Sequence, residues 1–163
     1  MGKYAAYQKQ VLECTCWLSE HGYFGSLRGT GGNVSVRIPG ESVFAITPST
    51  IPYAHLSPAD ICIVDFDRAQ REGEYPPSVE AGMHLAVYKN RLDVNAVVHT
   101  HQGKASAFAL LNRPIPALFD EVVMNLGHVV EIIPYAVSGS PDLAEHVAGK
   151  LGKSKLFEST RVS

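Results

Sequence analysis

The spacing of hydrophobic positions predicts a helix, a β-hairpin and a third strand in the first half of the chain. Apolar residues recur every three or four positions over residues 7–18, which is the period of one face of an α-helix. Three runs rich in β-branched residues follow, and the Pro39-Gly40 turn joins the first two into a predicted hairpin. The expected strands cover residues 34–38, 43–47 and 61–66.

The second half of the chain alternates between helical and extended patterns. Two prolines interrupt the pattern before Ser78, which is predicted to cap a helix over residues 79–89. Strands before this point and alternating helices and strands after it predict an α/β domain with a mixed or largely antiparallel central sheet. The further expected elements are strands over 95–101 and 129–135 and helices over 103–111 and 141–151, the last one capped by Ser140.

Length and composition narrow the class of protein. The 163 residues contain no repeat, linker or low-complexity tract, so one domain over residues 1–163 is expected. A net charge of −2 excludes a basic protein that binds mainly nucleic-acid phosphates. The mean hydropathy is zero, and no apolar run approaches ~18 residues, so no membrane-spanning helix is expected. The first ten residues lack a signal-peptide pattern, and Cys14 and Cys16 point apart on a helix, which predicts a cytoplasmic protein without disulfides.

His99 and His101 are the strongest chemical signal in the sequence. On the expected strand over 95–101, residues two apart point to the same face and lie ~6.6 Å apart at the backbone, so both imidazoles are able to bind one metal ion. The predicted helix over 79–89 has about the same length as this strand, roughly 17 Å, and an antiparallel return places Glu80 beside the histidines. Two histidines and a carboxylate predict a catalytic Zn²⁺ site, with Mn²⁺, Fe²⁺ and Co²⁺ as alternatives.

A purely structural role is the alternative for these histidines, with each imidazole satisfied by its neighbours in the sheet. His84 follows Glu80 by one helical turn. We expect His84 to be a packed, hydrogen-bonded histidine, and a role as ligand or as orienting neighbour is its alternative.

A glycine-rich segment, Gly29-Thr-Gly-Gly-Asn33, precedes the first expected strand. It lacks the lysine of a P-loop and leads into a strand, so it is not a dinucleotide-binding turn. Its backbone N–H groups are able to form an anion nest, to which Thr30 and Asn33 would add polar contacts. The segment Thr47-Pro-Ser-Thr50 and Ser78 at a helix N-terminus would complete one phosphate site. A tight turn for the glycines and a cap for Ser78 are the alternatives.

Four motifs, in this order, resemble the class II aldolase/adducin family, whose typical enzyme is fuculose-1-phosphate aldolase. They read G-T-G-G-N-V-S-V-R, I-T-P-S, P-S-V-E-x-x-x-H and A-V-V-H-T-H, and the likeness covers residues 8–152. The resemblance implies a three-layer α/β/α sandwich on a central, mostly antiparallel sheet. It also implies a C4 homotetramer with active sites at the subunit interfaces.

The same resemblance implies roles for individual residues. Glu80 matches the family's catalytic acid/base and metal-associated carboxylate, and His99 and His101 match two zinc ligands. The phosphate-site positions of the family fall on Thr30, Gly32, Asn33, Ser49, Thr50 and Ser78.

The sequence departs from the family pattern at three places. The family's third histidine ligand has no counterpart at residues 156–163, and the chain ends without the closing strand and helix, so a C-terminally truncated domain is expected. Val79 stands where the fuculose-phosphate aldolase has a second phosphate-binding serine. Asp120 falls where that aldolase has its proton-donating tyrosine, and an aspartate there resembles the family's ribulose-phosphate epimerases. A surface or capping aspartate is the alternative.

These inferences predict metal-dependent cleavage of a carbon–carbon bond in a sugar phosphate. The metal would stabilise the enediolate formed on cleavage, Glu80 would move the proton with Asp120 as a possible proton donor, and the glycine-rich loop would hold the phosphate. One alternative is a sugar-phosphate 4-epimerase or a dehydratase of the same fold. The other is a catalytically inactive, adducin-like module. No nucleic-acid or membrane partner is expected.

Overall fold

A five-stranded antiparallel sheet forms the centre of the molecule. The computed structural model describes residues 2–25 and 31–151, and the strands lie in the order β4-β3-β2-β1-β5. Every pairing within this sheet is antiparallel, which agrees with the sequence-based expectation and extends it. The strands are β1 (Asn33–Arg37), β2 (Val43–Ile46), β3 (Cys62–Asp65), β4 (Gln70–Glu72) and β5 (Ala96–His99).

The hairpin of β1 and β2 and the position of β5 bring distant residues to one edge. The turn between β1 and β2 contains Gly40 at φ +78°, a left-handed conformation that glycine adopts at no steric cost. On its other side β1 pairs with β5, in a register that sets Asn33 opposite His99. Two residues 66 positions apart therefore lie side by side at the beginning of one strand and the end of the other.

Alternating side chains of the inner strands pack on opposite faces of the sheet. Ala45 and Ile63 point toward α1 (Ala5–Glu20), whose residue Val11 is fully buried against them. Their neighbours Phe44 and Val64 point to the other face. This two-residue alternation follows from the pleat of a β-strand, and it gives the sheet two apolar faces.

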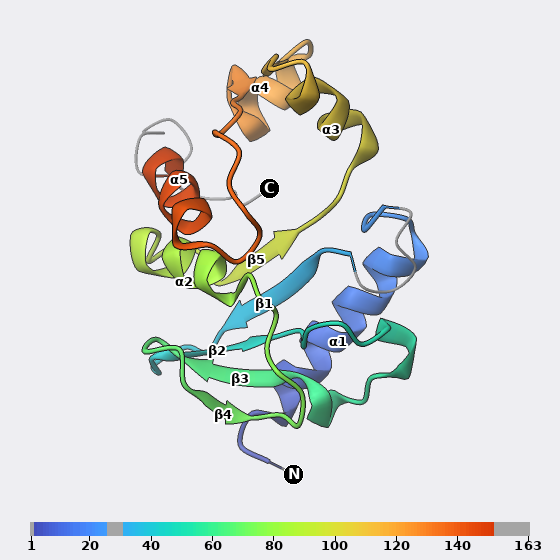
Figure 1. Cartoon of the computed structure of the whole chain (residues 1–163), viewed down its shortest axis with the longest axis vertical. Helices are drawn as coiled ribbons and strands as arrows, with labels where there is room; N and C mark the ends of the chain where they lie inside the picture. The colour runs from blue at the N-terminus through green and yellow to red at the C-terminus, as the bar shows by residue number, and fades with distance from the viewer. Residues whose placement is uncertain (1, 26–30, 152–163) are drawn as a thin grey trace.

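The second face is covered by α2 (Ala81–Asn90), with α5 (Pro141–Leu151) packed against it. Leu85 and Tyr88 of α2 join the buried cluster, and Val147 and Leu151 of α5 pack on that cluster from outside. The result is three layers, α1, the sheet, and α2 with α5, as Figure 1 shows. The predicted α/β sandwich is confirmed.

A separate part of the chain lies at the end opposite the N-terminus (Figure 1). We call residues 103–130 the arm, and α3 buries none of its side chains. The arm contains α3 (Gly103–Leu110), β6 (Ile115–Pro116), α4 (Asp120–Leu126) and β7 (Val129–Val130), while the 3₁₀ helices η1 (Tyr53–His55) and η2 (Pro58–Asp60) lie between β2 and β3.

Several element boundaries differ from the sequence-based expectation. The strand expected over 95–101 ends at His99, the helix expected from 79 begins at Ala81, and the strand expected over 129–135 is only two residues long. The short pairing of β6 with β7 has no neighbouring strand to extend it, and Pro134 has no N–H to donate to a ladder. The sequence pattern also missed β4, whose residues Gln-Arg-Glu carry no apolar alternation.

Two smaller expectations concern cysteines and membranes. Cys14, Cys16 and Cys62 are all free thiols. Within residues 2–25 and 31–151, no helix combines the length and the apolar character needed to cross a bilayer.

Candidate active site

The edge formed by β1 and β5 holds a buried carboxylate. Glu80 lies in the turn before α2, and its Oε2 contacts His99 Nδ1 at the end of β5. The side-chain amide of Asn33, opposite His99 on β1, donates to the same Oε2 at 2.8 Å. Glu80 is only 6% exposed. The antiparallel return of α2 expected from the sequence thus brings Glu80 to His99.

The turn over residues 78–80 presents Glu80 to the sheet. Ser78 Oγ accepts a hydrogen bond from the Glu80 N–H at 3.3 Å. The helix begins two residues later than expected, so Glu80 and not Ser78 occupies the N-cap position. Ala81 N–H donates to the Ser78 carbonyl at 2.9 Å, and this bond closes a turn over residues 78–81 just before the helix. The predicted N-cap role of Ser78 is therefore wrong, although its hydroxyl still serves this turn.

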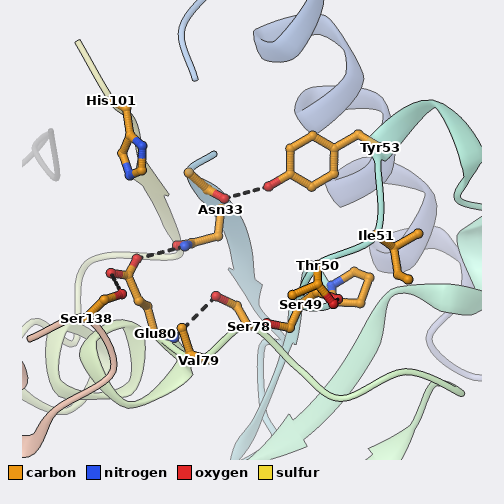
Figure 2. Close-up of a pocket in the computed structure, with 12 residues that line it drawn as sticks. Asn33, Ser49, Thr50, Ile51, Tyr53, Ser78, Val79, Glu80, His101 and Ser138 are labelled. Atoms are coloured by element: carbon orange, nitrogen blue, oxygen red, sulfur yellow. Dashed lines mark hydrogen bonds between the residues drawn. The ribbon is translucent and has the colours of Figure 1, made fainter. Parts of the chain in front are cut away.

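Ser138 is a site residue that the sequence did not single out. It lies in the segment before α5, and its hydroxyl donates to Glu80 Oε1 at 2.7 Å, so both carboxylate oxygens have partners. Figure 2 shows the hydroxyl of Ser138 pointing at Glu80. The two residues are 58 positions apart, and no local pattern marks such a contact in a single sequence.

The surroundings of Glu80 favour its ionised form. Burial raises the pKa of the carboxyl, but hydrogen bonds from His99, Asn33 and Ser138 outweigh burial and lower the pKa from its usual 4.5 to about 2. A buried carboxylate that stays charged at neutral pH and lies at the edge of a pocket is able to accept a proton from a bound molecule.

His101 completes the predicted trio, but it lies beyond the end of β5. Its ring and that of His99 are 4.8 Å apart between centroids, with an angle of 64° between their planes. Burial and the neighbouring His99 lower the pKa of His101, while Glu80 acts in the opposite direction. The two imidazole rings are therefore adjacent, as expected, although β5 ends at His99 and does not include His101.

The fit of these residues to a metal ion is partial. In the part of the chain that the structure describes, no three His, Cys, Asp or Glu side chains are grouped to hold a metal. His99 uses Nδ1 to contact Glu80, and a carboxylate on one ring nitrogen is the usual partner of a histidine that binds metal through the other. Two imidazoles beside a carboxylate suit Zn²⁺ and its first-row neighbours. The two imidazoles therefore form an incomplete ligand set, with Glu80 as the carboxylate that orients His99.

The described phosphate-site candidates line one pocket of about 270 Å³ together with Glu80. Its hydroxyl groups come together because the segment after β2 pairs with the segment before α2. Ser49 N–H donates to the Pro76 carbonyl at 2.9 Å, and Ser78 N–H donates to the Thr47 carbonyl at 3.0 Å. In Figure 2 the carboxylate lies on one side of the pocket and Ser49 on the other. The predicted residues in the lining are Gly32, Asn33, Ser49, Thr50 and Ser78.

Two pocket residues have partners that the sequence did not indicate. Asn33 turns its amide to Glu80 rather than into open space, and no hydrogen-bond partner is found for its buried Oδ1 among the described residues. Tyr53, which the sequence did not single out, donates to the Gly32 carbonyl at 2.5 Å. Burial, followed by the nearby Glu80 charge, raises the pKa of Tyr53 to about 12, so this phenol remains a hydrogen-bond donor.

Three predicted features lie elsewhere. Asp120 is exposed at the first turn of α4, where a negative charge suits the helix dipole, and it does not line the pocket with Glu80. Thr30 and the stretch over 156–163, where the family's third histidine is expected, fall outside the described residues.

His84 is fully buried one turn after Glu80, as expected for a packed histidine. Its Nδ1 lies 2.6 Å from Ser35 Oγ, which is also 2.7 Å from the Tyr88 hydroxyl. Within the described ranges no partner is found for its Nε2, so this histidine is only half satisfied. Burial and the nearby His99 lower its pKa to about 3, against an opposing effect of Glu80.

Comparison with known proteins places this site in context. Residues 9–159 match the family model of the class II aldolase and adducin N-terminal domain. The chain is 41% identical over 147 residues to an L-fuculose phosphate aldolase of Escherichia coli O6:H1, a match that covers 90% of this chain and 66% of the relative. It is also 41% identical to a 5-methylthioribulose-1-phosphate/5-deoxyribulose-1-phosphate aldolase of Escherichia coli O45:K1, over 80% of this chain and 60% of that relative.

Solved structures agree with this family. An L-fuculose 1-phosphate aldolase superposes with a TM-score of 0.81 at 30% identity, over 91% of this chain and 71% of the other. The L-fuculose-1-phosphate aldolase of Thermus thermophilus superposes with a TM-score of 0.68 at 34% identity, over 92% and 70% of the two chains. The chain thus spans about two thirds of the length of these relatives. It belongs to the class II aldolase and adducin family.

Proposed function

We propose that the protein is a metal-dependent lyase that cleaves a sugar phosphate by a retro-aldol reaction. The observation that carries the proposal is the buried carboxylate of Glu80, held against His99 at the edge of a pocket lined by hydroxyl and backbone groups. The aldolases named above act on phosphorylated sugars, which supports a sugar phosphate as the substrate class.

In this proposal Glu80 moves a proton at the carbon next to the substrate carbonyl. Its contacts with His99, Asn33 and Ser138 keep the carboxylate ionised and hold it at the edge of the pocket. Ser49, Thr50 and Ser78, with Thr30, Gly32 and Asn33, would bind the phosphate from the opposite side. Binding energy from that remote group would then orient the reacting carbon at Glu80.

His99 and His101 would hold the metal, with Glu80 as the associated carboxylate. A bound Zn²⁺, or Mn²⁺, Fe²⁺ or Co²⁺, supplies Lewis-acid stabilisation of the negative charge that develops on substrate oxygen. The chain's own contribution is to fix both imidazoles at the end of β5 and to keep Glu80 deprotonated beside them.

The test combines metal content with product analysis. We expect purified protein to bind Zn²⁺, and His99→Ala to lose both the metal and the cleavage of sugar phosphates. Exposed His55 lies outside the pocket, so His55→Ala is the matched control and should retain both. Aldol cleavage releases two fragments, whereas an epimerase returns an isomer with the same carbon count. Activity that persists after verified removal of the metal would refute the proposal, and absence of metal at saturating Zn²⁺ would favour the inactive, adducin-like module.

We also propose that the protein acts in the cytoplasm as a homotetramer, as the family resemblance implies. The arm supports an assembly of several copies, because it exposes large apolar side chains on a surface that one subunit leaves uncovered. These side chains include Leu110, Leu118, Phe119 and Met124.

A further inference from the structure

The segment just before α5 contributes a hydroxyl group to the pocket. Ser138 donates to Glu80 Oε1 at 2.7 Å, while Asn33 and His99 both contact Oε2. The two oxygens of one carboxylate are thus held from different parts of the fold. We propose that Ser138 is a positioning residue for Glu80, an inference that rests on the proposed function.

The backbone around Ser138 is built to approach the turn that carries Glu80. Gly139 adopts φ +75°, and a Cβ at this position would lie 2.8 Å from the Val79 carbonyl oxygen. The bond from Ser140 N–H to the Val137 carbonyl, at 3.0 Å, closes the turn around Ser138. The left-handed φ and the lack of space for a Cβ both require glycine at position 139, and this glycine lets the turn around Ser138 approach the turn over residues 78–80.

Helix α5 determines where this turn lies. The Ser140 hydroxyl accepts a hydrogen bond from Leu143 N–H at 3.2 Å, so it caps the first turn of α5. Val147 and Leu151 of α5 pack on the apolar cluster that contains Leu85 of α2. Since α2 begins directly after Glu80, the two helices fix both partners of the contact.

A second anchor matters because a glutamate side chain rotates about three bonds. Contacts to Oε2 alone would hold one oxygen and leave Oε1 free to move. The bond to Oε1 removes this freedom, so one orientation of the carboxylate is presented to a bound molecule. Correct orientation of a reacting group raises turnover without requiring tighter substrate binding.

Kinetics of matched variants test this role. For cleavage of a sugar phosphate, Ser138→Ala is expected to lower kcat about tenfold, the loss typical of one hydrogen bond to a charged group, with KM close to that of the wild type. Ser138→Thr retains the hydroxyl and should restore most of kcat. Ser140→Ala is the control, because it removes a hydroxyl of the same turn that does not touch Glu80. It should lower Tm, and its kcat should fall much less than that of Ser138→Ala.

A measurement that needs no activity separates this inference from the proposed function. In urea unfolding, Ser138→Ala and Glu80→Ala should give non-additive changes in the midpoint when combined, because each removes the same contact. Additive changes would overturn the inference, and so would a wild-type kcat in Ser138→Ala. If the wild type cleaves no sugar phosphate but the midpoints are non-additive, the proposed function and the catalytic role of Ser138 are both overturned. That result would confirm only the hydrogen bond between Ser138 and Glu80.

Discussion

Glu80 and His84 are both buried, but Glu80 is stabilised in its charged form and His84 in its neutral form. Glu80 is buried and well paired, so its charged form is stabilised. His84 is buried one turn away with one ring nitrogen that finds no partner among the described residues, so its neutral form is stabilised instead. Burial disfavours the charged form of both groups, and only Glu80 has hydrogen bonds to its charged form that outweigh this effect.

The depressed pKa of His84 predicts a pH-dependent stability. Above about pH 6.5 the His84 imidazole is neutral in both the folded and the unfolded state. As the pH falls below 6.5, the imidazole becomes protonated in the unfolded state but stays neutral in the folded state, where its pKa is about 3. The wild type should thus lose stability as pH falls from about 6.5 to 4.5, by at most about 1.4 kcal/mol per pH unit from this group. In the folded state Glu80 remains ionised throughout that window, because its pKa is about 2.

Urea unfolding across this pH window measures the effect. His84→Gln should flatten the decline in the free energy of unfolding, whereas His55→Ala, which changes an exposed histidine, should leave its slope unchanged. Parallel slopes for the wild type and His84→Gln would show that His84 does not cause the pH dependence.

At the scale of elements, patterns of hydrophobic residues predicted most of the sheet and its covering helices. The hairpin, β3, α1 and α5 were expected within a few residues because each presents an apolar face to the core at the period of its backbone. β4 and the pairing of β6 with β7 were not expected in this form, because their side chains are mostly exposed or their pairing is short. The glycine-rich segment marked the start of β1 in the sequence, but no sequence pattern showed which residues pack against these glycines.

Gly32 connects that glycine-rich segment to the site. It adopts φ +72°, and a Cβ there would meet the Phe24 ring and lie 2.5 Å from the His99 carbonyl oxygen. Gly40 has φ +78° with no atom within 4 Å, so Gly40→Ala isolates the conformational cost, about 1 to 2 kcal/mol. Gly32→Ala should cost about 1 to 3 kcal/mol more, because it adds overpacking.

Chemical unfolding of both variants checks this difference, and the activity of Gly32→Ala should also fall because Asn33 and His99 are displaced. Equal losses of stability in the two alanine variants would mean that the space around Gly32 relaxes readily, which would contradict the predicted clash.

At the scale of the whole molecule, the apolar surface is divided between a closed core and an open arm. The two faces of the sheet are covered by α1 and by α2 with α5, whereas the arm leaves Leu118 74% exposed. A surface of this kind favours association, since burying it against other subunits removes apolar area from water.

The proposed tetramer makes this surface testable. Light scattering should give a mass of about four times the 17.7 kDa of one chain. Leu118→Glu should shift the protein toward monomers, because it places a charge in the apolar surface of the arm. Leu92→Glu is the matched control, since Leu92 is similarly exposed, at 79%, but lies outside the arm. A monomeric wild type, or dissociation by both variants alike, would contradict the assignment of the arm as the interface.

The amino-acid sequence by itself indicated the residues that we propose to carry the chemistry and the α/β class of the fold. Periodic hydrophobic positions specify which face of each element is buried, and the spacing of Glu80, His99 and His101 is enough to indicate a common site. The tertiary structure decided how that site is assembled. It joined Ser138 and Asn33 to Glu80 and left Asp120 on the arm, because contacts between residues tens of positions apart depend on how the helices pack on the sheet, which no local pattern encodes.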